Sequence, residues 1–505
     1  AYQADVLNKL SPLASVSAGY DDFGQITFDS NYTSAFGEYG ITYNGTGTIA
    51  LNGTTFANFK DGTIDALNGS NKSIALVADN VSYKDSVLRT GQNFNYTTDS
   101  ANYSDSNVKI VTADGVTFNY LRNGAIKGAK NGNQTVNNYD LVDNNSGVVR
   151  SITMDNSGLA AYATNDGTSK HAISSGNVDI VNNSASGSKI NIADSMIKAT
   201  KLINDEDGNI YIAASTPNGV GSATTTVKGS RLESVNTIAY DAQGNEIGNT
   251  YADNGGVIKV VGTDVTIDDS TVKAAGSKVS STTNAGSISV NATKGNAKVT
   301  DSQLIGYNDV SIYGVNDIDV EDSLIYAKDA NFTNYTNPGT SNVQLVTTKK
   351  INVDNSDLYA SGDVDLLTTY SNGNLYAGQY NSTTGTWTQD GGITVNDSTI
   401  SAAKDLSLQS GDTTLDDTTL VYDTITFTGK QLSTSAGNKG GGTAYGNNLT
   451  IKDGTTFTDK NNGSVSRDID ISTDGNLTVD NGTLKLSSYS IAFGDDSGTK
   501  DGYSY

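Results

Sequence analysis

Carboxylates are the most abundant side chains in this sequence that could act in acid–base chemistry. The 505-residue chain carries 55 acidic residues, and adjacent carboxylates occur at Asp268–Asp269 and Asp416–Asp417. Glycoside hydrolysis requires such a pair, one acting as acid and the other as base or nucleophile. Both pairs, however, occupy the corner position of a repeat described below, where Asp recurs as a turn residue. We therefore predict that these carboxylates are structural, that there are no catalytic residues, and that the chain is not an enzyme.

Metal and nucleophile chemistry has few candidates. There is no Cys and a single His, His171, which excludes the usual zinc and thiol sites. The polar neighbours of His171 favour a surface position. The run Asp205–Glu206–Asp207–Gly208–Asn209 partly matches a calcium loop but lacks its distal bidentate Glu. We predict a hairpin turn there, with no metal and no cofactor. The arginines share no spacing that would suit a lyase: Arg89, Arg122, Arg150, Arg231 and Arg467.

One stretch is rich in aromatic side chains that could bind a ligand. It contains Tyr370, Tyr376, Tyr380 and Trp387. Exposed aromatic rings can stack on sugar rings or anchor a protein interface. The same rings could instead cover one side of the structure or fill a seam beneath a hairpin, and the sequence leaves these alternatives open.

Composition and charge limit the remaining classes. Hydrophobic residues make up 35% of the chain, and the formal net charge is −23. An acidic surface of this size repels nucleic acid and anionic lipid, and no apolar run reaches the roughly 18 residues of a membrane-spanning helix. Disorder would also fit low hydrophobicity, but the 27 Tyr and 11 Phe oppose it. Turn- and strand-forming residues dominate, which excludes a helical protein.

A repeat supplies the fold. The repeat begins with an apolar, a polar and a second apolar residue, followed by one polar residue and an Asp/Asn–Ser pair. After the pair come any residue, an apolar residue, any residue and a small residue. Clear copies are 190–199, 265–274, 297–304, 318–327, 351–360 and 393–402, and degenerate copies lie near Ser86, Ser157, Ser230, Thr418, Gly454 and Gly482.

The spacing of the copies predicts an all-β parallel β-helix, or β-solenoid, with rungs of about 20 residues. Ser302 and Ser323 are 21 residues apart, while Ser356 and Ser398 are 42 apart, as occasional insertions would produce. Alternate apolar residues face inward, the Asp/Asn–Ser pair turns a corner, and a third strand follows, for example at Val310–Ile312. The chain would hold about 20 rungs stacked at roughly 4.8 Å. Ile192, Ile267, Val320, Val353 and Val395 should then lie in the core.

The domain prediction is an N-terminal cap over residues 1–45, where the repeat is absent, and a continuous solenoid over 46–505. Hairpin insertions are expected at Asn204–Asn209, at Gln243–Asn245 and at Ser371–Asn374, from their turn residues.

The Asp/Asn–Ser repeat resembles that of filamentous haemagglutinin-like exoproteins of bacterial two-partner secretion. The resemblance is carried by Ile351–Leu366, Leu477–Leu486 and Asn71–Gly91. It implies a right-handed coil, export to the bacterial cell surface, and an adhesive or scaffolding role.

These features together predict an extracellular bacterial surface protein, an adhesin-type rod that attaches to a host cell, a neighbouring cell or a surface glycan. The alternative is a self-assembling subunit of a surface filament or layer. A polysaccharide-active β-helix enzyme is a third and less favoured class. No nucleic-acid partner and no membrane-spanning segment are expected.

Overall fold

The structure is a computed structural model, and it describes the strands and the turns next to them. The described residues are 26–28, 32–37, 40–45, 48–52, 55–58, 74–78, 80–84, 87–90, 108–113, 149–161, 164–165, 177–184, 186–201, 208–216, 221–236, 238–239, 256–274, 286–328, 339–368, 379–381, 386–388, 391–410, 412–422, 424–429, 449–451, 456–459, 468–473, 477–479, 483–484 and 490–494. Within these ranges all regular structure is β, and there is no helix. The chain divides into two units, Ala1–Ser289 and Val290–Tyr505.

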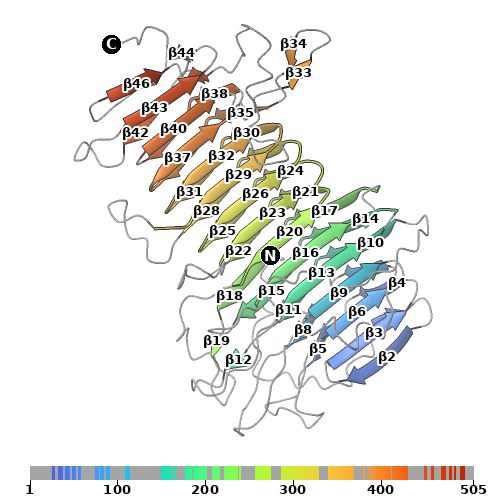
Figure 1. The fold of residues 1–505 in the computed structure, drawn as a ribbon. Coiled ribbons are helices and arrows are strands. Elements are labelled where there is room, and N and C mark those ends of the chain that lie inside the picture. The colour runs from blue at the N-terminus through green and yellow to red at the C-terminus, as the bar shows by residue number, and fades with distance from the viewer. Residues whose placement is uncertain are drawn as a thin grey trace. The chain divides into compact units, whose positions relative to one another are not determined.

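The first unit has three stacks of strands, which we name the first, second and third sheet in the order that the chain visits them from β4 onward (Figure 1). The first sheet contains β1 (Ile26–Phe28), β4 (Thr48–Asn52), β7 (Asn80–Lys84), β10 (Arg150–Asp155), β14 (Ser188–Ala193), β17 (Ala223–Lys228) and β21 (Asp264–Asp268). The second contains β5 (Thr55–Asn58), β8 (Val87–Thr90), β11 (Gly158–Ala161), β15 (Met196–Lys201), β18 (Arg231–Asn236) and β22 (Thr271–Ala274). The third contains β2 (Tyr32–Gly37), β3 (Gly40–Gly45), β6 (Ile74–Ala78), β9 (Val108–Ala113), β13 (Val178–Asn183), β16 (Ile210–Ser215), β20 (Ile258–Gly262) and β23 (Ile288–Ala292), which contains the end of the unit.

The second unit repeats the arrangement. Its first sheet contains β24 (Ala297–Thr300), β27 (Ile318–Glu321), β30 (Lys350–Asp354), β35 (Gly392–Asn396), β38 (Asp412–Asp416), β41 (Leu449–Ile451) and β44 (Leu477–Val479). Its second contains β25 (Gln303–Gly306), β28 (Leu324–Ala327), β31 (Asp357–Ala360), β36 (Thr399–Ala402), β39 (Thr419–Tyr422), β42 (Thr456–Asp459) and β45 (Thr483–Leu484). Its third contains β26 (Val310–Gly314), β29 (Val343–Thr347), β32 (Val364–Thr368), β37 (Asp405–Gln409), β40 (Thr424–Gly429), β43 (Asp468–Thr473) and β46 (Ser490–Gly494).

Consecutive rungs pair in parallel and in register, which confirms the β-solenoid. Ile318 lies opposite Ile351, which in turn lies opposite Ile393. The five positions predicted to face the core are at most 1% exposed: Ile192, Ile267, Val320, Val353 and Val395. Buried and half-exposed residues alternate along the strands because successive side chains point to opposite faces. Each rung therefore buries its apolar side chains against the rungs above and below it.

The rungs are longer than the sequence suggested. The described strands form six rungs in the first unit and seven in the second, not about 20 in all. The shortest spacing is close to the expected value, since Ser302 and Ser323 are 21 residues apart. Insertions are the rule, however, and 33 or 42 residues separate the next pairs of corner serines.

Antiparallel pairs occur at the N-terminal side and in one insertion. β2 pairs with β3 in antiparallel fashion within residues 1–45, the segment predicted as a cap, and β1 of that segment pairs in antiparallel fashion with β4, which follows it. The insertion after β32 contains an antiparallel pair, β33 (Gln379–Asn381) and β34 (Thr386–Thr388). A hairpin thus forms in that insertion, further along than Ser371–Asn374, which lies outside the described residues, as does Gln243–Asn245.

The hairpin predicted across Asn204–Asn209 is wrong. Ile210–Ile212 belongs to β16, which pairs in parallel with β13 on one side and with β20 on the other. Both edges of β16 are therefore occupied, and no antiparallel partner can pair with it across the turn. The segment connects the second sheet to the third.

Candidate functional site

The corner between the first and second sheets contains the Asp/Asn–Ser pair, and we call it the Asp–Ser corner. Its first residue has a positive φ of 44–49° at Asn156, Asp194, Asp269, Asp301, Asp322, Asn355, Asp397 and Asp417. Gly229 occupies the equivalent position with φ 56°. Left-handed backbone is accessible to Gly and is tolerated by Asn and Asp far better than by bulky residues. The predicted role of these residues as turn formers is confirmed.

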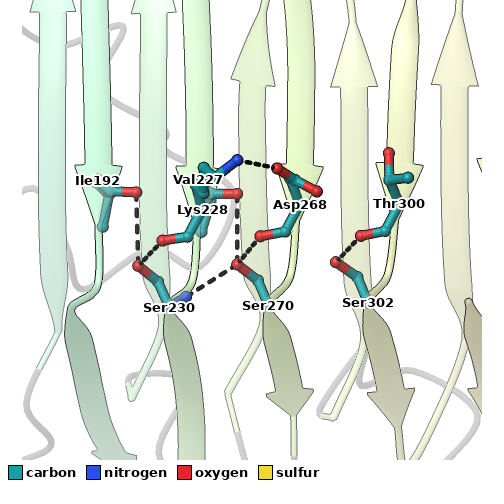
Figure 2. A network of polar contacts seen from close by, with 8 residues as sticks. All are labelled: Ile192, Val227, Lys228, Ser230, Asp268, Ser270, Thr300 and Ser302. Carbon is teal, nitrogen blue, oxygen red and sulfur yellow. Dashed lines mark hydrogen bonds and ion pairs between the residues drawn. The ribbon is translucent and has the colours of Figure 1, made fainter. Parts of the chain in front are cut away.

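The second residue of the corner is a buried hydroxyl side chain whose oxygen bonds backbone groups. In the first unit the Ser270 Oγ donates to the Asp268 carbonyl at 2.7 Å and accepts the Ser230 N–H at 3.0 Å (Figure 2). In the second unit Ser302 Oγ donates to the Thr300 carbonyl at 2.6 Å, and the Ser302 N–H donates to Ser323 Oγ at 3.1 Å (Figure 2 shows the first of these bonds).

The same bonds recur along each unit as a ladder of hydroxyls. In the first unit the N–H of Ser157 and of Ser195 donates to the hydroxyl of the following rung. In the second unit the N–H of Ser323 and of Ser356 does the same. Hydroxyls such as those of Ser195, Ser230 and Ser356 thus accept a backbone N–H from one rung and donate to a backbone carbonyl of their own rung. The ladder is a structural element that closes the corner.

The two predicted carboxylate pairs lie at this corner. Asp268 ends β21 and receives an ion pair from Lys228 at 2.7 Å, and Asp269 is the left-handed turn residue. The hydrogen bond that Lys228 donates to the Asp268 carboxylate raises the pKa of Lys228, with the charge of Asp268 acting in the same direction. At the other pair, Asp416 accepts the Asp397 N–H through its carbonyl, and Asp417 is again the left-handed residue. Both pairs thus occupy the corner position expected from the repeat.

The calcium-like run is only partly described, at Gly208 and Asn209. Asn209 Oδ1 accepts the Val257 N–H at 2.7 Å, and the Asn209 N–H donates to Asn177 Oδ1 at 2.7 Å. Its amide therefore joins successive rungs. Asp205, Glu206 and Asp207 lie outside the described residues. In the described part of the chain no three His, Asp or Glu side chains are grouped closely enough to hold a metal ion.

Several other residues that the sequence offered as site candidates lie outside or at the edge of the described ranges. His171, Tyr370, Tyr376, Arg122 and Arg467 lie outside the described residues. Tyr380 and Trp387 are directly opposite each other in the pairing of β33 with β34.

The arginines that the structure describes lie in different strands. Arg89 belongs to β8, and Arg150 is buried in β10. Arg231 in β18 forms an ion pair with Glu233 of the same strand. The three arginines of the described ranges therefore belong to three different strands.

The outer face of the third sheet in the second unit carries two rows of side chains that the sequence did not single out. The polar row is Gln344, Asp365 and Ser407, and the apolar row is Tyr313, Val346 and Leu367. The members of each row are opposite one another in successive strands. Tyr313 is 36% exposed, and the other five are partly exposed. Since both rows lie at the outward positions of the repeat's third strand, alignment of the rungs could have located them.

Hydrogen bonds connect the polar row. Tyr313 Oη donates to Gln344 Oε1 at 3.4 Å, and Gln344 Nε2 donates to Asp365 Oδ2 at 3.2 Å. Partial burial raises the pKa of Asp365, and the charges of Asp363 and Asp405 add to this, while hydrogen bonds from Gln344 and Ser407 oppose it. The arrangement offers amide, carboxylate and hydroxyl groups beside an exposed aromatic ring.

Two further tyrosine environments lie on outer faces. Tyr326 and Tyr359 are opposite each other on the second sheet of the second unit, with ring centroids 6.0 Å apart in an edge-to-face arrangement. In the first unit, burial raises the pKa of Tyr211 to about 12, helped by the nearby charge of Asp179. The Tyr211 phenol is therefore protonated at neutral pH.

Insertions are distributed unequally among the three corners. At the Asp–Ser corner, every connection between 53–54 in the first unit and 417–418 in the second is two residues long. The last two connections at this corner, 452–455 and 480–482, are longer. All six rungs of the first unit carry a longer segment between the second and third sheets, at 59–73, 91–107, 162–177, 202–209, 237–257 and 275–287. In the second unit, longer segments between the second and third sheets are 328–342 and 460–467. Longer segments between the third and first sheets of that unit are 369–391 and 430–448.

Two insertions of the first unit also pair with each other. β12 (Thr164–Asn165) and β19 (Ile238–Ala239) form a short parallel sheet. Their parent strands β11 and β18 are separated by β15 in the second sheet. The insertions thus lie side by side although a rung intervenes between their origins.

Comparisons with known proteins return no relative. No family model, no curated protein and no solved structure matches this chain. None of the described segments forms a helix with the length and apolar character needed to cross a bilayer. The fold is therefore established by the stacked parallel sheets alone.

Proposed function

We propose that this chain is an extracellular adhesin-type protein of a bacterial surface, a solenoid that attaches to a host cell, a neighbouring cell or a surface glycan. The observation that carries the proposal is the unequal distribution of insertions. One corner has a constant two-residue connection over most of the rungs, whereas the other two corners carry segments of varied length.

This distribution suits a scaffold that presents contact segments. Binding residues in proteins concentrate on loops held by a rigid framework. The Asp–Ser corner supplies the framework, because its ladder fixes the register of each rung against the next. The segments between the second and third sheets leave the first unit at the same corner in every rung, so they emerge in one row.

The composition is compatible with an extracellular location. The chain has no Cys that an oxidising environment could cross-link wrongly, and its net charge of −23 favours solubility at high concentration. The Asp/Asn–Ser repeat, which resembles that of bacterial exoproteins, points in the same direction.

The test is attachment of the purified, fluorescently labelled chain to bacterial and epithelial cells. Residues 328–342 are replaced by the three-residue connection Tyr307–Asp309 of the preceding rung, which already joins β25 to β26. In separate variants 369–391 and 162–177 are replaced by Gly/Ser segments of equal length. Saturable binding by the native chain, with loss in at least one of these variants, supports the proposal.

Three outcomes would overturn it. One is the absence of saturable binding to any cell. Another is concentration-dependent polymerisation in negative-stain images without cell binding, which would favour a filament or layer subunit. The third is turnover of a polysaccharide that is lost on substitution of a single Asp, which would indicate an enzyme.

A further inference from the structure

The two rows on the outer face of the third sheet in the second unit form a surface that we call the Tyr313 strip: Tyr313, Val346, Leu367, Gln344, Asp365 and Ser407. We infer that this strip binds a neutral, β-1,4-linked glycan that lies across the strands, parallel to the stacking direction. The inference deepens the proposed attachment function and rests on it.

The strip combines the two kinds of contact that a pyranose ring requires. The ring has apolar C–H faces and a rim of hydroxyl groups. The Tyr313 ring, with Val346 and Leu367 beyond it, provides a surface for the C–H faces. Gln344, Asp365 and Ser407 provide donors and acceptors for the hydroxyl rim.

The polar row is held in place before any ligand arrives. Gln344 is fixed by the bond that it receives from Tyr313 Oη and by the bond that it donates to Asp365. Ser407 contacts the same carboxylate from the following rung. A surface with pre-positioned polar groups loses less conformational freedom on binding than one with mobile side chains.

The period of the solenoid favours a linear β-1,4 chain. Neighbouring strands are about 4.8 Å apart. One ring of an extended β-1,4-linked pyranose chain has nearly that length, so one ring would lie over each rung. Alternate rings are turned over, and each would present one of its two C–H faces to the strip. A strip of three or four rungs matches three or four rings before the two periods diverge.

Charge decides between neutral and acidic glycans. Asp365 is the one ionisable carboxyl among the six residues, and the whole chain carries a net charge of −23. A uronic-acid or sulfated glycan would be repelled by both. A protein partner is also disfavoured, because a stable interface covers about 800 Å² on each side and the apolar row consists of three side chains.

The experiment measures binding of cellohexaose and of chitohexaose to the full chain by isothermal titration calorimetry, with circular dichroism to verify folding. Tyr313→Ala and Gln344→Ala should each weaken binding by about tenfold or more. Tyr326→Ala is the matched control, since it removes a tyrosine from the outer face of the neighbouring sheet in the same unit, and it should leave binding unchanged.

The inference is overturned if neither hexaose binds the native chain, or if Tyr313→Ala binds as well as Tyr326→Ala does. The same variants in the cell-attachment assay separate the two proposals. Attachment that persists in Tyr313→Ala overturns the strip while the adhesin proposal stands, and absence of attachment by the native chain, with hexaose binding intact, overturns the adhesin proposal alone.

Discussion

The Asp–Ser corner and the corner between the second and third sheets solve the same geometric problem in different ways. At the first, a buried hydroxyl and a left-handed residue satisfy the backbone within two residues. At the second, connections range from one residue between β39 and β40 to twenty-one at 237–257. A side-chain ladder continues from rung to rung at this corner too, since the Asn342 N–H donates to Asp309 Oδ1 and the Asp363 N–H donates to Asn342 Oδ1. That ladder lies at the residue just before each third-sheet strand, so the length of chain ahead of it can vary. The comparison teaches that a corner stays uniform where its ladder residue must also close the turn within two residues, and varies where the ladder residue only marks the start of the next strand.

The largest effect should come from lengthening each corner equally. Insertion of Gly-Ser-Gly-Ser between Asp322 and Ser323 displaces the Ser323 hydroxyl from the Ser302 N–H and separates β27 from β28. We expect a loss of at least about 3 kcal/mol, because several buried hydrogen bonds break together. The same insertion within 328–342 should cost less than about 0.5 kcal/mol, since loop entropy grows slowly with length.

Thermal melting of both variants by circular dichroism checks this prediction, and hydrogen exchange at β27 and β28 locates the change. Equal melting temperatures for the two insertions would contradict the contrast between the corners.

The next largest effect should come from removing a single corner hydroxyl, that of Ser323. Ser323→Ala leaves the buried N–H of Ser302 without its acceptor and removes the bond to the Glu321 carbonyl. Leaving a buried donor unsatisfied costs about 1–3 kcal/mol. Ser323→Thr should restore most of the loss, because Thr418 makes the corresponding bond to the Asp416 carbonyl at 2.9 Å.

Urea denaturation compares Ser323→Ala with Ser311→Ala, a half-exposed serine on an outer face of the same unit. Similar midpoints for the two alanine variants would show that the ladder does not hold the corner.

A smaller effect concerns the left-handed residue. Asp301 has φ 49°. A β-branched side chain is disfavoured in this region, so Asp301→Val should destabilise by about 1–2 kcal/mol. Asp301→Gly should be nearly neutral, as Gly229 already serves at the equivalent position of another rung. The difference in denaturation midpoint between the Val and Gly variants measures the backbone strain, and its absence would mean that the corner relaxes without cost.

Much of this comparison could be predicted from the sequence. The Asp/Asn–Ser pair identified the corner, and the apolar positions beside it, such as Val353, identified the core. The number of rungs could not be predicted, because degenerate copies and long insertions hide the period.

The Tyr313 strip was missed for a different reason. Tyr313, Val346 and Leu367 belong to third strands whose insertions place them 33 and 21 residues apart, so that their neighbourhood shows only once the rungs are aligned or the strand pairing is known. The aromatic stretch near Trp387 attracted notice because its members are close in sequence. Closeness in sequence and closeness across rungs are different signals in a solenoid.

The smallest effect should come from the ion pair beside the corner. Lys228 and Asp268 are 2.7 Å apart, but the Lys228 side chain is 63% exposed. Water and salt screen such a pair, so Lys228→Ala should change the melting temperature less than Ser323→Ala does. The pair raises the pKa of Lys228 above its ordinary 10.5, so its contribution is present at neutral pH and is lost as pH rises beyond that value. The native chain and the variant should therefore converge at high pH and in 1 M NaCl. A Lys228→Ala defect as large as that of Ser323→Ala, and insensitive to salt, would mean that charge rather than the hydroxyl ladder holds the Asp–Ser corner.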